Sequence, residues 1–541
     1  MQTKFVVVLG TLLSGLGKGV VTASMLKMFS FYGYKALPVK FDGYLNYDCG
    51  TMNPYRHGEV FVLDDKGEVD MDFGTYERFS GRNLTSDLSI TGGKLFGTII
   101  EKERRGDFLG RDIQIIPHLT DEILNRIKAI ANSKKPDILV IEVGGTVGDI
   151  ENSYFIEAMR QLALQEKVVF VAVTYIPKLS VVGEQKTKPT QLAFRDIMHA
   201  GIIPAFWVCR SEEPINEQTK EKLSLFTNIE KSRIIDDSTQ ASIYSMPIYF
   251  MKQGFGKALL DALGMGNARL SNEKYKRFAS LLKEPRGLEE KIAIVGKYVD
   301  LKDSYASVKE ALVHSALKEG VRLNIKWIEA EEIEKNGASI LEGVDGIIVP
   351  GGFGKRGTEG MISAIKYARE NSIPFLGLCF GMQLMCIEFA RNVCKLEKAG
   401  STELDKGLKN KIIYTMPSQR GLSKKGATMR LGAWKCNIVE KNSIAYKAYK
   451  AYAIMERHRH RYEFNNKYKE LMSSKGMLFS GINITNNLVE IAEWKSSFGV
   501  GTQFHPEFKS RIEKPAPLFL SFVHAAGAYA RKTKSNKNLQ S

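Results

Sequence analysis

The sequence predicts an α/β protein: a doubly wound, parallel-sheet domain followed by a second α/β domain with a mixed sheet. Three observations support this. Apolar runs alternate with helical patterns through residues 1–267, a second series of the same kind fills residues 291–530, and a charged stretch without strand patterning (268–290) separates them. We therefore expect two domains joined by a linker and followed by a basic tail (531–541).

The strands of the first domain are expected where short apolar runs are bounded by polar or glycine residues. These runs are 4–9, 36–40, 137–143, 168–176, 202–209 and 246–251. Helical patterns lie between them, so the sheet should be parallel and covered on both faces.

In the second domain the earlier runs resemble those of the first, and the later ones alternate between apolar and polar residues. The continuous runs are 291–296, 321–328, 346–350 and 373–378; the alternating runs are 477–485, 488–494 and 499–504. Alternation is typical of antiparallel strands, so we expect a mixed sheet here.

Composition excludes several classes of protein. Hydrophobic residues make up 44% of the 541 residues, and no apolar stretch approaches the ~20 residues that span a bilayer. We expect no signal peptide, and six cysteines without a CxxC pair fit a reducing cytoplasm. The net charge of +17 suits either nucleic acid or polyanionic small molecules. The positive charge is spread through the chain, and the tail segment 531–537 is its only short basic cluster. We expect that segment to be disordered.

A cysteine on a sharp turn indicates nucleophilic chemistry. Cys379 follows the apolar run 373–378, precedes a helical pattern and is flanked closely by glycines, which is the pattern of a nucleophile elbow. A helix N-terminus favours the thiolate, and backbone N–H groups there can hold an oxyanion. Far downstream, His505 and Glu507 supply a base and its orienting carboxylate. Together they predict acyl chemistry on an amide.

A glycine-rich loop follows the first strand. Gly15, Gly17 and Gly19 surround Lys18, a pattern that can expose backbone N–H groups to phosphate. The match to a P-loop is partial, because Leu12 takes the place of its leading glycine and Gly19 that of its Ser or Thr. The alternative is a simple tight turn.

Acidic residues near this sheet are candidates for Mg²⁺. Asp70 and Asp72 stand close together, and Glu142 ends the strand 137–143, where ligands of parallel sheets bind. The alternative for each is a helix cap or a surface acid. Lys186 and Lys188 are spaced so that an extended segment would turn both towards one polyanion, a solvated loop being the alternative.

Four stretches in this order resemble the CTP synthase family. They are HGEVFV (57–62), GTVGDIE (145–151), KTKPTQ (186–191) and RHRHRYE (457–463), and similarity covers nearly the whole chain apart from the linker and the tail. The resemblance implies a glutamine-dependent amidoligase. ATP phosphorylates the 4-oxygen of UTP, and ammonia from glutamine then displaces phosphate to give CTP.

The resemblance also implies nucleotide and metal ligands in the first domain. ATP would be bound by Gly15, Leu16, Gly17, Lys18, Gly19, Val20, Lys40 and Asp72, and Mg²⁺ by Asp72 and Glu142. UTP, and the inhibitor CTP, would be bound by Ser14, Asp149, Ile150, Glu151, Glu157, Lys186, Thr187, Lys188, Pro189, Thr190, Gln191 and Lys222. Thr11 and Gly43 depart from the family pattern and put ATP affinity in question.

In the second domain the resemblance implies a class I glutaminase with the triad Cys379, His505 and Glu507. Glutamine would be bound by Gly352, Leu378, Phe380, Gly381, Gln383, Glu403 and Arg461. GTP would activate the glutaminase at a loop containing Phe353 and Arg356, and ammonia would pass His57 and Val60. By charge alone, 457–461 suggests a nucleic-acid patch; the resemblance instead makes Arg461 a partner for the glutamine carboxylate.

The family further implies a cytoplasmic homotetramer, a dimer of dimers that can extend into filaments, with no nucleic-acid or membrane partner. Two other hypotheses stay open. One is an amidoligase acting on a carboxylate, which the joint presence of KTKPTQ and GTVGDIE disfavours. The other is a scaffold with a dead enzyme core, which the intact Cys379, His505, Lys18 and Glu142 disfavour.

Overall fold

The computed structural model describes residues 2–540 apart from 180–182, 284, 286, 406 and 416–428, with side chains as far as residue 535. The chain forms two compact units. Unit 1 comprises Met1–Asp48 and Thr75–Leu282, and unit 2 comprises Cys49–Gly74 and Lys283–Ser541. The segment Cys49–Gly74, here called the inserted segment, thus leaves the N-terminal half and folds with the C-terminal half.

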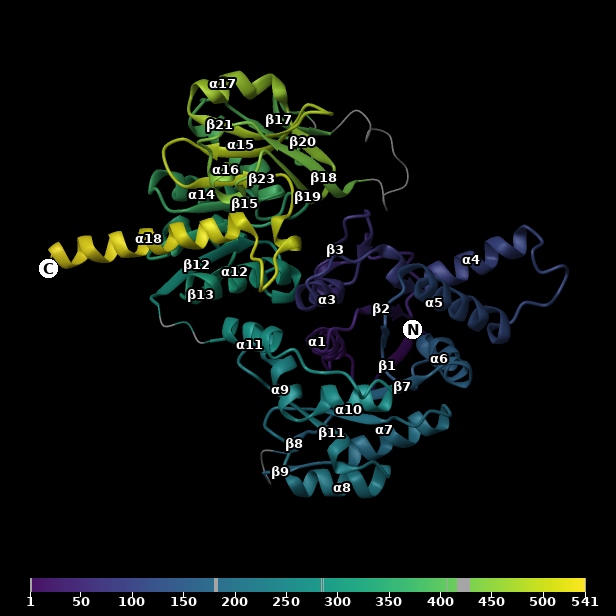
Figure 1. The fold of residues 1–541 in the computed structure, drawn as a ribbon. Coiled ribbons are helices and arrows are strands. Elements are labelled where there is room, and N and C mark those ends of the chain that lie inside the picture. Colours follow the sequence, from purple (N-terminus) through teal and green to yellow (C-terminus); the bar gives the residue numbers. More distant parts are fainter. Residues whose placement is uncertain are drawn as a thin grey trace. The chain divides into compact units, whose positions relative to one another are not determined.

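Within the described residues, unit 1 is built on a seven-stranded sheet, in the order β11-β10-β7-β1-β6-β2-β5, whose neighbours are all parallel (Figure 1). The strands are β1 (Lys4–Gly10), β2 (Ala36–Asp42), β5 (Ser89–Thr91), β6 (Ile138–Val143), β7 (Val168–Tyr175), β10 (Phe206–Ser211) and β11 (Ile234–Ser238). The carboxyl ends of β1 and β6 lie side by side, so the loops that follow them meet. The expected parallel α/β fold is confirmed.

Helices cover this sheet and connect its strands. They are α1 (Lys18–Phe31), α3 (Asp72–Ser80), α4 (Gly92–Arg104), α5 (Thr120–Lys134), α6 (Ser153–Gln165), α7 (Lys188–His199), α8 (Glu217–Thr227), α9 (Met246–Lys252), α10 (Phe255–Ala262) and α11 (Asn272–Leu281). Helix α3 begins in the inserted segment and continues into unit 1.

Two expectations for unit 1 are wrong. The run 246–251 is helix α9, because Pro247 cannot donate to a sheet ladder but suits a first helical turn. The strand beside β10 is instead β11. It was not predicted because Asp236 and Asp237 interrupt its apolar run. Helix α11, within the expected linker, buries Phe278 fully against Phe31 of α1.

Unit 2 holds, within its described part, a nine-stranded mixed sheet in the order β13-β12-β14-β15-β23-β22-β21-β18-β19. Its strands are β12 (Glu289–Gly296), β13 (Arg322–Glu329), β14 (Gly346–Val349), β15 (Phe375–Leu378), β18 (Arg430–Ile438), β19 (Ala453–His460), β21 (Met477–Asn483), β22 (Leu488–Trp494) and β23 (Gly499–Thr502). Pairs from β13 to β23 are parallel and the remainder antiparallel. The expected mixed sheet is confirmed.

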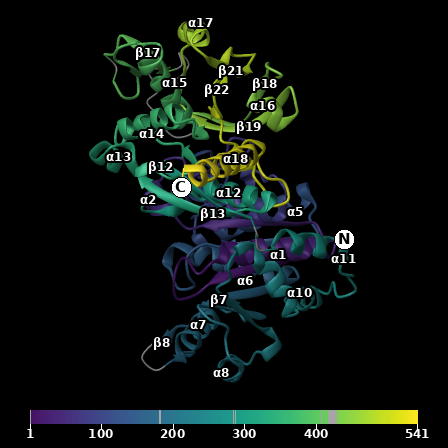
Figure 2. The ribbon, with the colours of Figure 1, turned by 90° about the vertical axis from the view of Figure 1, so that its left-hand side faces the viewer.

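Alternation along β12 separates two cores on the faces of this sheet. Ile292 and Ile294 join one cluster with Phe519 and Phe522, whereas Ala293 and its neighbours face another. Helices α12 (Ala306–Glu319) and α18 (Pro517–Gln540) pack on the first face, side by side in Figure 2. The other helices of unit 2 are α13 (Ala330–Asn336), α14 (Thr358–Glu370), α15 (Phe380–Asn392), α16 (Ile444–Tyr449) and α17 (Lys469–Ser474).

Smaller elements complete unit 2. The inserted segment contributes α2 (Pro54–His57) and the hairpin β3 (Phe61–Val62) and β4 (Glu68–Val69). A small sheet is formed by β16 (Ala399–Ser401), β17 (Asn410–Thr415) and β20 (Tyr462–Phe464), while β8 (Lys178–Leu179) and β9 (Glu184–Gln185) pair in unit 1.

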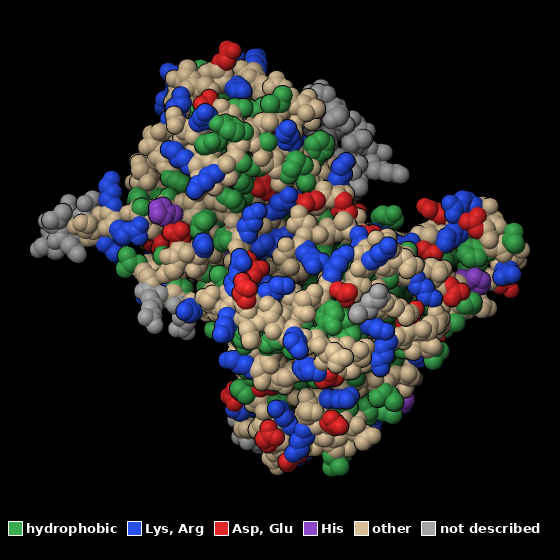
Figure 3. Space-filling model, in the orientation of Figure 1, with side chains coloured by type: hydrophobic (Ala, Val, Ile, Leu, Met, Phe, Trp, Pro, Cys, Tyr) green, Lys and Arg blue, Asp and Glu red, His purple; other side chains and the backbone are tan. Residues whose placement is uncertain are grey.

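The basic tail differs from the expectation, since α18 continues through it to Gln540. The sequence of the tail contains no glycine or proline that would end the helix. Figure 3 shows Lys and Arg side chains spread over both units among Asp and Glu on the face in view. None of the described helices is both long enough and apolar enough to cross a membrane.

Candidate active sites

Cys379 lies at the turn between β15 and α15, with φ 50° and ψ −96°, a conformation that strains a residue with a side chain. Its N–H donates to the carbonyl of Thr502 at 2.6 Å. A Cβ on Gly381 would lie 2.0 Å from the carbonyl oxygen of Val349, and one on Gly377 would lie 2.8 Å from the carbonyl carbon of Gly381. Glycine is therefore required on both sides of the thiol, as in a nucleophile elbow.

The structure brings His505 and Glu507 to this thiol. His505 Nδ1 lies 2.7 Å from Glu507 Oε1, which fixes the ring. A Cβ on Gly351 would lie 3.0 Å from His505 Cε1 and 3.9 Å from Cys379 Cβ, so the imidazole and the thiol face the same loop. Gln503, which the sequence reading missed, donates from Nε2 to Cys379 Sγ at 3.6 Å; its position two residues before His505 is the only sequence signal for it.

The charge state of His505 is set by opposing effects. Burial lowers its pKa, but the Glu507 carboxylate and then Cys379 raise it, to about 10. Because the ordinary value is near ~6.5, the charged pair stabilises the fold fully below that pH. The contribution is lost as the pH rises through about 10. An imidazolium able to protonate a leaving amine is therefore present at neutral pH.

Replacing Glu507 by glutamine is expected to shift the alkaline limb of glutamine hydrolysis to lower pH. Without the carboxylate, burial dominates and the imidazolium is lost earlier as the pH rises. We also expect kcat to fall by roughly 10²–10⁴-fold, as when the orienting acid of a triad is removed. Glutamate release measured across pH 6 to 11 tests this; an unchanged limb would remove Glu507 from its orienting role.

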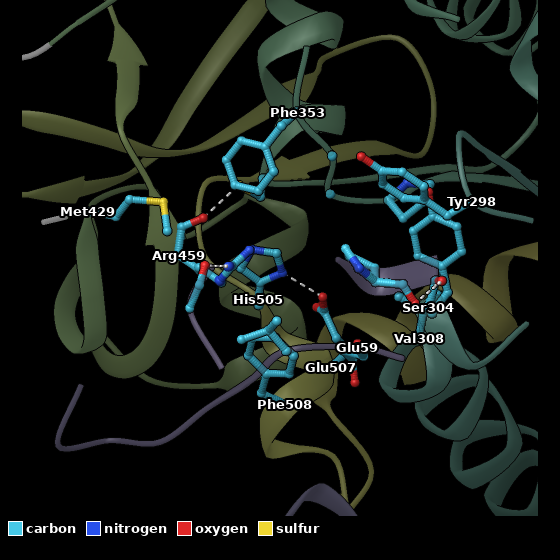
Figure 4. A pocket seen from close by; sticks show the side chains of 18 of the residues that line it. Glu59, Tyr298, Ser304, Val308, Phe353, Met429, Arg459, His505, Glu507 and Phe508 are labelled. Atoms are coloured by element: carbon cyan, nitrogen blue, oxygen red, sulfur yellow. Dashed lines mark hydrogen bonds and ion pairs between the residues drawn. The ribbon is translucent and has the colours of Figure 1, made fainter. Parts of the chain in front are cut away.

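A cavity of about 540 Å³ opens at the triad (Figure 4). The catalytic part is lined by Cys379, His505, Glu507, Gly352, Phe353 and Arg461. The inserted segment lines another part, with Gly50, Thr51, Met52, Pro54, Glu59 and Val60. Of the two residues expected along an ammonia route, Val60 lines the cavity, whereas His57 lies exposed at the end of α2.

The expected glutamine ligands surround the same elbow. Gln383 donates to the carbonyl of Tyr462 at 3.1 Å and to Gln503 at 3.2 Å. Glu403 accepts the N–H of Gly354 at 2.8 Å. Leu378 and Phe380 are buried on either side of the thiol.

Lys297, which the sequence reading missed, secures the loop that faces the thiol. Its ammonium donates to the carbonyls of Phe353, at 3.2 Å, and Gly354, and lies 4.4 Å from the ring centroid of Phe380. Burial lowers the pKa of Lys297 to about 8, although Glu403 opposes that shift. Lys297 thus links the loop before helix α14 to Phe380, the residue that follows Cys379.

Arg356, expected in the GTP loop, is anchored within unit 2. It donates to Glu329 at 2.9 Å, to Glu331 at 2.7 Å and to the hydroxyl of Tyr55 at 2.8 Å. Phe353 is 40% exposed, with the guanidinium of Arg459 5.5 Å from its ring centroid. An aromatic face and a cation therefore border the mouth of the cavity.

The arginine–histidine stretch is not a surface patch. His458 and His460 are buried on one side of β19, where burial lowers the pKa of each well below its usual value. Arg457 and Arg459 point to the other side and pair with carboxylates of the inserted segment. The nucleic-acid interpretation of these charges has no structural support.

The glycine loop of unit 1 has the geometry that phosphate binding needs. Gly15 (φ 76°) and Gly17 (φ 88°) adopt left-handed conformations, and Gly19 lies in the first turn of α1. Lys18 Nζ donates to the carbonyl of Gly145 at 2.6 Å. A Cβ on Gly10 would lie 2.6 Å from that ammonium, which explains a glycine there.

A cavity of about 150 Å³ adjoins this loop. It is lined by Gly15, Leu16, Gly17 and Val20 of the loop and by Arg210, Asp237, Thr239, Gln240, Ser242, Ile243 and Met246. Burial raises the pKa of Asp237 to about 7, although Arg210 opposes the shift. The sequence analysis missed these residues because they come from β10, β11 and the segment from Thr239 to Met246, all distant in sequence from the loop.

The acidic candidates lie in different settings. Glu142 is 1% exposed; it accepts the hydroxyl of Tyr76 at 2.5 Å and lies 3.7 Å from Lys40 Nζ. Asp72 is the first residue of α3. Asp70 Oδ1 accepts the N–H of Asp72 at 2.9 Å, so Asp70 has the capping geometry of the alternative reading. Among described residues, no three His, Cys, Asp or Glu side chains gather as a metal-binding group.

A third cavity, of about 300 Å³, collects several expected UTP residues. It is lined by Val147, Gly148, Asp149, Ile150, Ser153, Ile156, Glu157, Asp196 and Ala200. Glu151, which follows Ile150, is exposed, and so is Ser14 in the glycine loop. Glu157 pairs with Arg160 at 2.8 Å. Gly43 has no room for a side chain, since a Cβ would lie 2.4 Å from Asn152 Oδ1.

The lysine-rich stretch is not extended as expected. Helix α7 begins at Lys188 with Pro189 in its first turn, because proline fits that position. Gln191 donates to the hydroxyl of Thr187 at 3.1 Å, and Thr190 is buried beside Thr174. Lys186 (2.6 Å) and Lys222 (3.5 Å) share Glu184. The structure thus brings Lys186 and Lys222 together.

Comparison with known proteins places both halves of the chain in one family. The model of the CTP synthase N-terminus matches residues 4–265, and that of class I glutamine amidotransferases matches residues 300–525. A CTP synthase of Pyrococcus abyssi is 51% identical over 98% of this chain and 99% of its own length. One from Caldanaerobacter subterraneus is 46% identical over 97% of this chain and 98% of its own length. The glutaminase domain of a Trypanosoma brucei CTPS, solved with bound acivicin, is 41% identical over 44% of this chain and 94% of that domain, with a TM-score of 0.42.

Proposed function

Because this chain belongs to the CTP synthase family, we propose that sites on its two units divide one reaction between them. The chain converts UTP to CTP with ammonia from glutamine, as a ligase with glutaminase activity. The observation that carries the assignment of residues is the elbow at Cys379, with His505 and Glu507 facing it.

In unit 2, the Cys379 thiolate attacks the amide carbon of glutamine. Backbone N–H groups at the start of α15 and in the loop after Val349 stabilise the oxyanion. His505 donates its proton to the departing ammonia, and water then hydrolyses the thioester. Arg461 holds the glutamine carboxylate, and Glu403 and Gln383 are proposed as further ligands of the glutamine.

Ammonia leaves through the part of the cavity lined by the inserted segment. Val60 lies on that wall, and the cavity is continuous from the triad to Gly50 and Pro54. His57 is proposed further along the route. The wall at Met52, Pro54 and Val60 is largely apolar. This suits ammonia, which is small and neutral and needs no charged side chains along its route.

In unit 1, the loop from Gly15 to Val20 binds the phosphates of ATP, with Lys18 and Lys40 as neutralising cations. Asp72 and Glu142 are the proposed Mg²⁺ ligands; carboxylate oxygens suit this hard cation. When bound, Mg²⁺ neutralises phosphate charge during phosphoryl transfer. Glu142 is buried and held in place by Tyr76 and Lys40, which supports its proposed role as a charged Mg²⁺ ligand in a fixed position.

The remaining assignments follow the family. UTP, and CTP as inhibitor, are proposed at the third cavity, with Ser14, Asp149, Ile150, Glu151, Glu157, Lys222 and the stretch Lys186, Thr187, Lys188, Pro189, Thr190 and Gln191. GTP is proposed to activate at Phe353 and Arg356, where an exposed ring offers a stacking face for a base.

We also propose a homotetramer, a dimer of dimers able to extend into filaments, in the cytoplasm. Large apolar side chains are exposed along α4 and the loop that leads to α5, among them Ile100 (59%), Leu109 (87%) and Ile116 (52%). Such a surface is typical of an interface. Size determination with and without UTP and ATP tests this assembly.

The proposed function is tested by measuring CTP formation with UTP, ATP and Mg²⁺, supplied with either glutamine plus GTP or ammonium. Activity with both nitrogen sources is expected. Activity with ammonium alone would leave the roles of Cys379, His505 and Glu507 unsupported. Absence of CTP with either source would overturn the proposed assignments as a whole.

A further inference from the structure

Two arginines of β19 meet carboxylates of the inserted segment. Arg457, fully buried, donates from Nε to Asp64 Oδ1 at 2.6 Å. Arg459 donates from Nε to Glu68 Oε1 at 2.8 Å and from Nη2 to the carbonyl of Gly50 at 3.1 Å. Glu68 is 3% exposed. Charges this deeply buried depend on their partners, so these pairs hold the hairpin β3–β4 to β19.

The backbone carbonyls of the same two arginines contact the catalytic residues Cys379 and His505, here called the dyad. The carbonyl of Arg457 accepts the N–H of His505 at 2.8 Å, and the carbonyl of Arg459 lies 3.8 Å from Cys379 Sγ as its acceptor. Each arginine therefore links the inserted segment, by its side chain, with the catalytic dyad, by its carbonyl. A shift of β19 would move both supports at once.

A second line of contact joins the inserted segment to His505 through aromatic rings. Phe61 of β3 packs edge-on against Phe508, with ring centroids 5.1 Å apart. Phe508 in turn stacks on His505, at 5.0 Å and 20° (Figure 4). The guanidinium of Arg457 lies 5.4 Å from the centroid of Phe61. The imidazole thus rests on a stack whose outer ring belongs to the inserted segment.

We propose that the inserted segment positions the glutaminase dyad, through Arg457–Asp64, Arg459–Glu68 and the Phe61–Phe508 stack. This inference rests on the proposed function, in which Cys379 and His505 hydrolyse glutamine. The segment returns to unit 1 through α3, whose first residue, Asp72, is the proposed metal ligand. The backbone from Asp72 to Glu68, and then the Glu68–Arg459 ion pair, connect that end of the segment with the strand that contacts the dyad.

The test compares Glu68→Gln, Asp64→Asn and Phe61→Leu with the unaltered full-length chain. We expect kcat for glutamate release to fall by about 10-fold or more in Glu68→Gln, with KM for glutamine within about two-fold, because the substrate ligands remain. Alkylation of Cys379 by a chloroketone analogue of glutamine should slow by the same factor. Ammonium-dependent CTP formation should stay within about two-fold, and Glu68→Asp should recover part of the loss.

Lys509→Gln is the matched control. This partly exposed lysine also contacts Asp64, at 3.3 Å, but holds neither dyad residue, so its loss should leave glutamate release unchanged. If Glu68→Gln does not fold, Asp64→Asn decides, since the Asp64 side chain is 32% exposed. Unchanged kcat in both Asp64→Asn and Phe61→Leu would overturn the proposal. Failure of the proposed function would appear instead in the unaltered chain, as absent glutamate release.

Discussion

Replacing Cys379 by alanine is expected to abolish glutamine-dependent CTP formation and glutamate release, by about 10³-fold or more, because no other group can form the thioester. Ammonium-dependent CTP formation should stay within about two-fold, since the residues proposed for phosphoryl transfer do not include this thiol. Both rates are measured by following CTP absorbance and released glutamate in the same preparations.

Cys386→Ala provides the matched control for the loss of a thiol. Cys386 lies on α15, the helix that follows Cys379, and is fully buried. Burial raises its pKa far above the ordinary value, so it is not a nucleophile. This variant should keep both activities. If Cys379→Ala loses ammonium-dependent synthesis as well, the two sites are not separable and the division of labour proposed above is wrong.

Replacing Glu142 by glutamine is expected to abolish CTP formation with either nitrogen source, by about 10³-fold or more, because a Mg²⁺ ligand serves the phosphoryl transfer common to both. Glutamine keeps the shape of the side chain and its contact with Tyr76, so the fold should survive. Glutamate release without nucleotides, measured in the same sample, reports whether unit 2 remains intact.

Tyr76→Phe separates the charge of Glu142 from its surroundings. It removes the 2.5 Å hydrogen bond to the carboxylate but leaves the carboxylate itself. We expect a loss of about ten-fold or less, together with a higher Mg²⁺ requirement. Appreciable ammonium-dependent turnover in Glu142→Gln would reject Glu142 as a metal ligand and leave Asp72 to be tested alone.

Much of the architecture could be predicted because buried parallel strands read as continuous apolar runs. The bounds of β1 and β6 differ from the expected runs by one residue each. Two predictions based on apolar character were wrong. The apolar run with Pro247 forms a helix, and β11 was not expected as a strand because it contains Asp236 and Asp237. Local chemistry there outweighed periodicity.

The catalytic dyad could be anticipated for a different reason. A nucleophile elbow needs small residues at fixed distances in sequence from the nucleophile. Gly377 and Gly381 meet this requirement and can be recognised in the sequence. The roles of Gln503, Lys297 and Phe508 could not be read in this way. Each depends on contacts with residues distant in sequence, such as Phe61 against Phe508, which no local pattern encodes.

The membership of the inserted segment also lay beyond sequence reasoning. Its short apolar run 60–63 lies within the first half of the chain, and nothing local distinguishes a hairpin that serves one unit from a hairpin that serves the other. Contacts with residues far along the chain reveal it, among them the pairs that Asp64 and Glu68 form with arginines of β19. Long-range contacts, with charged pairs among them, therefore mark this segment as part of unit 2 where periodicity does not.

That long-range pairing has a consequence for how the protein is made. Asp64 and Arg457 are separated by 393 residues. At a synthesis rate of about 5–20 residues per second, roughly 20 to 80 seconds pass between the emergence of the hairpin and that of its strand partner. During this interval Phe61 and Val62, fully buried in the finished protein, have no docking surface. A ribosome-bound chain must therefore keep this early hairpin from aggregating until the last quarter of the polypeptide arrives to cover it.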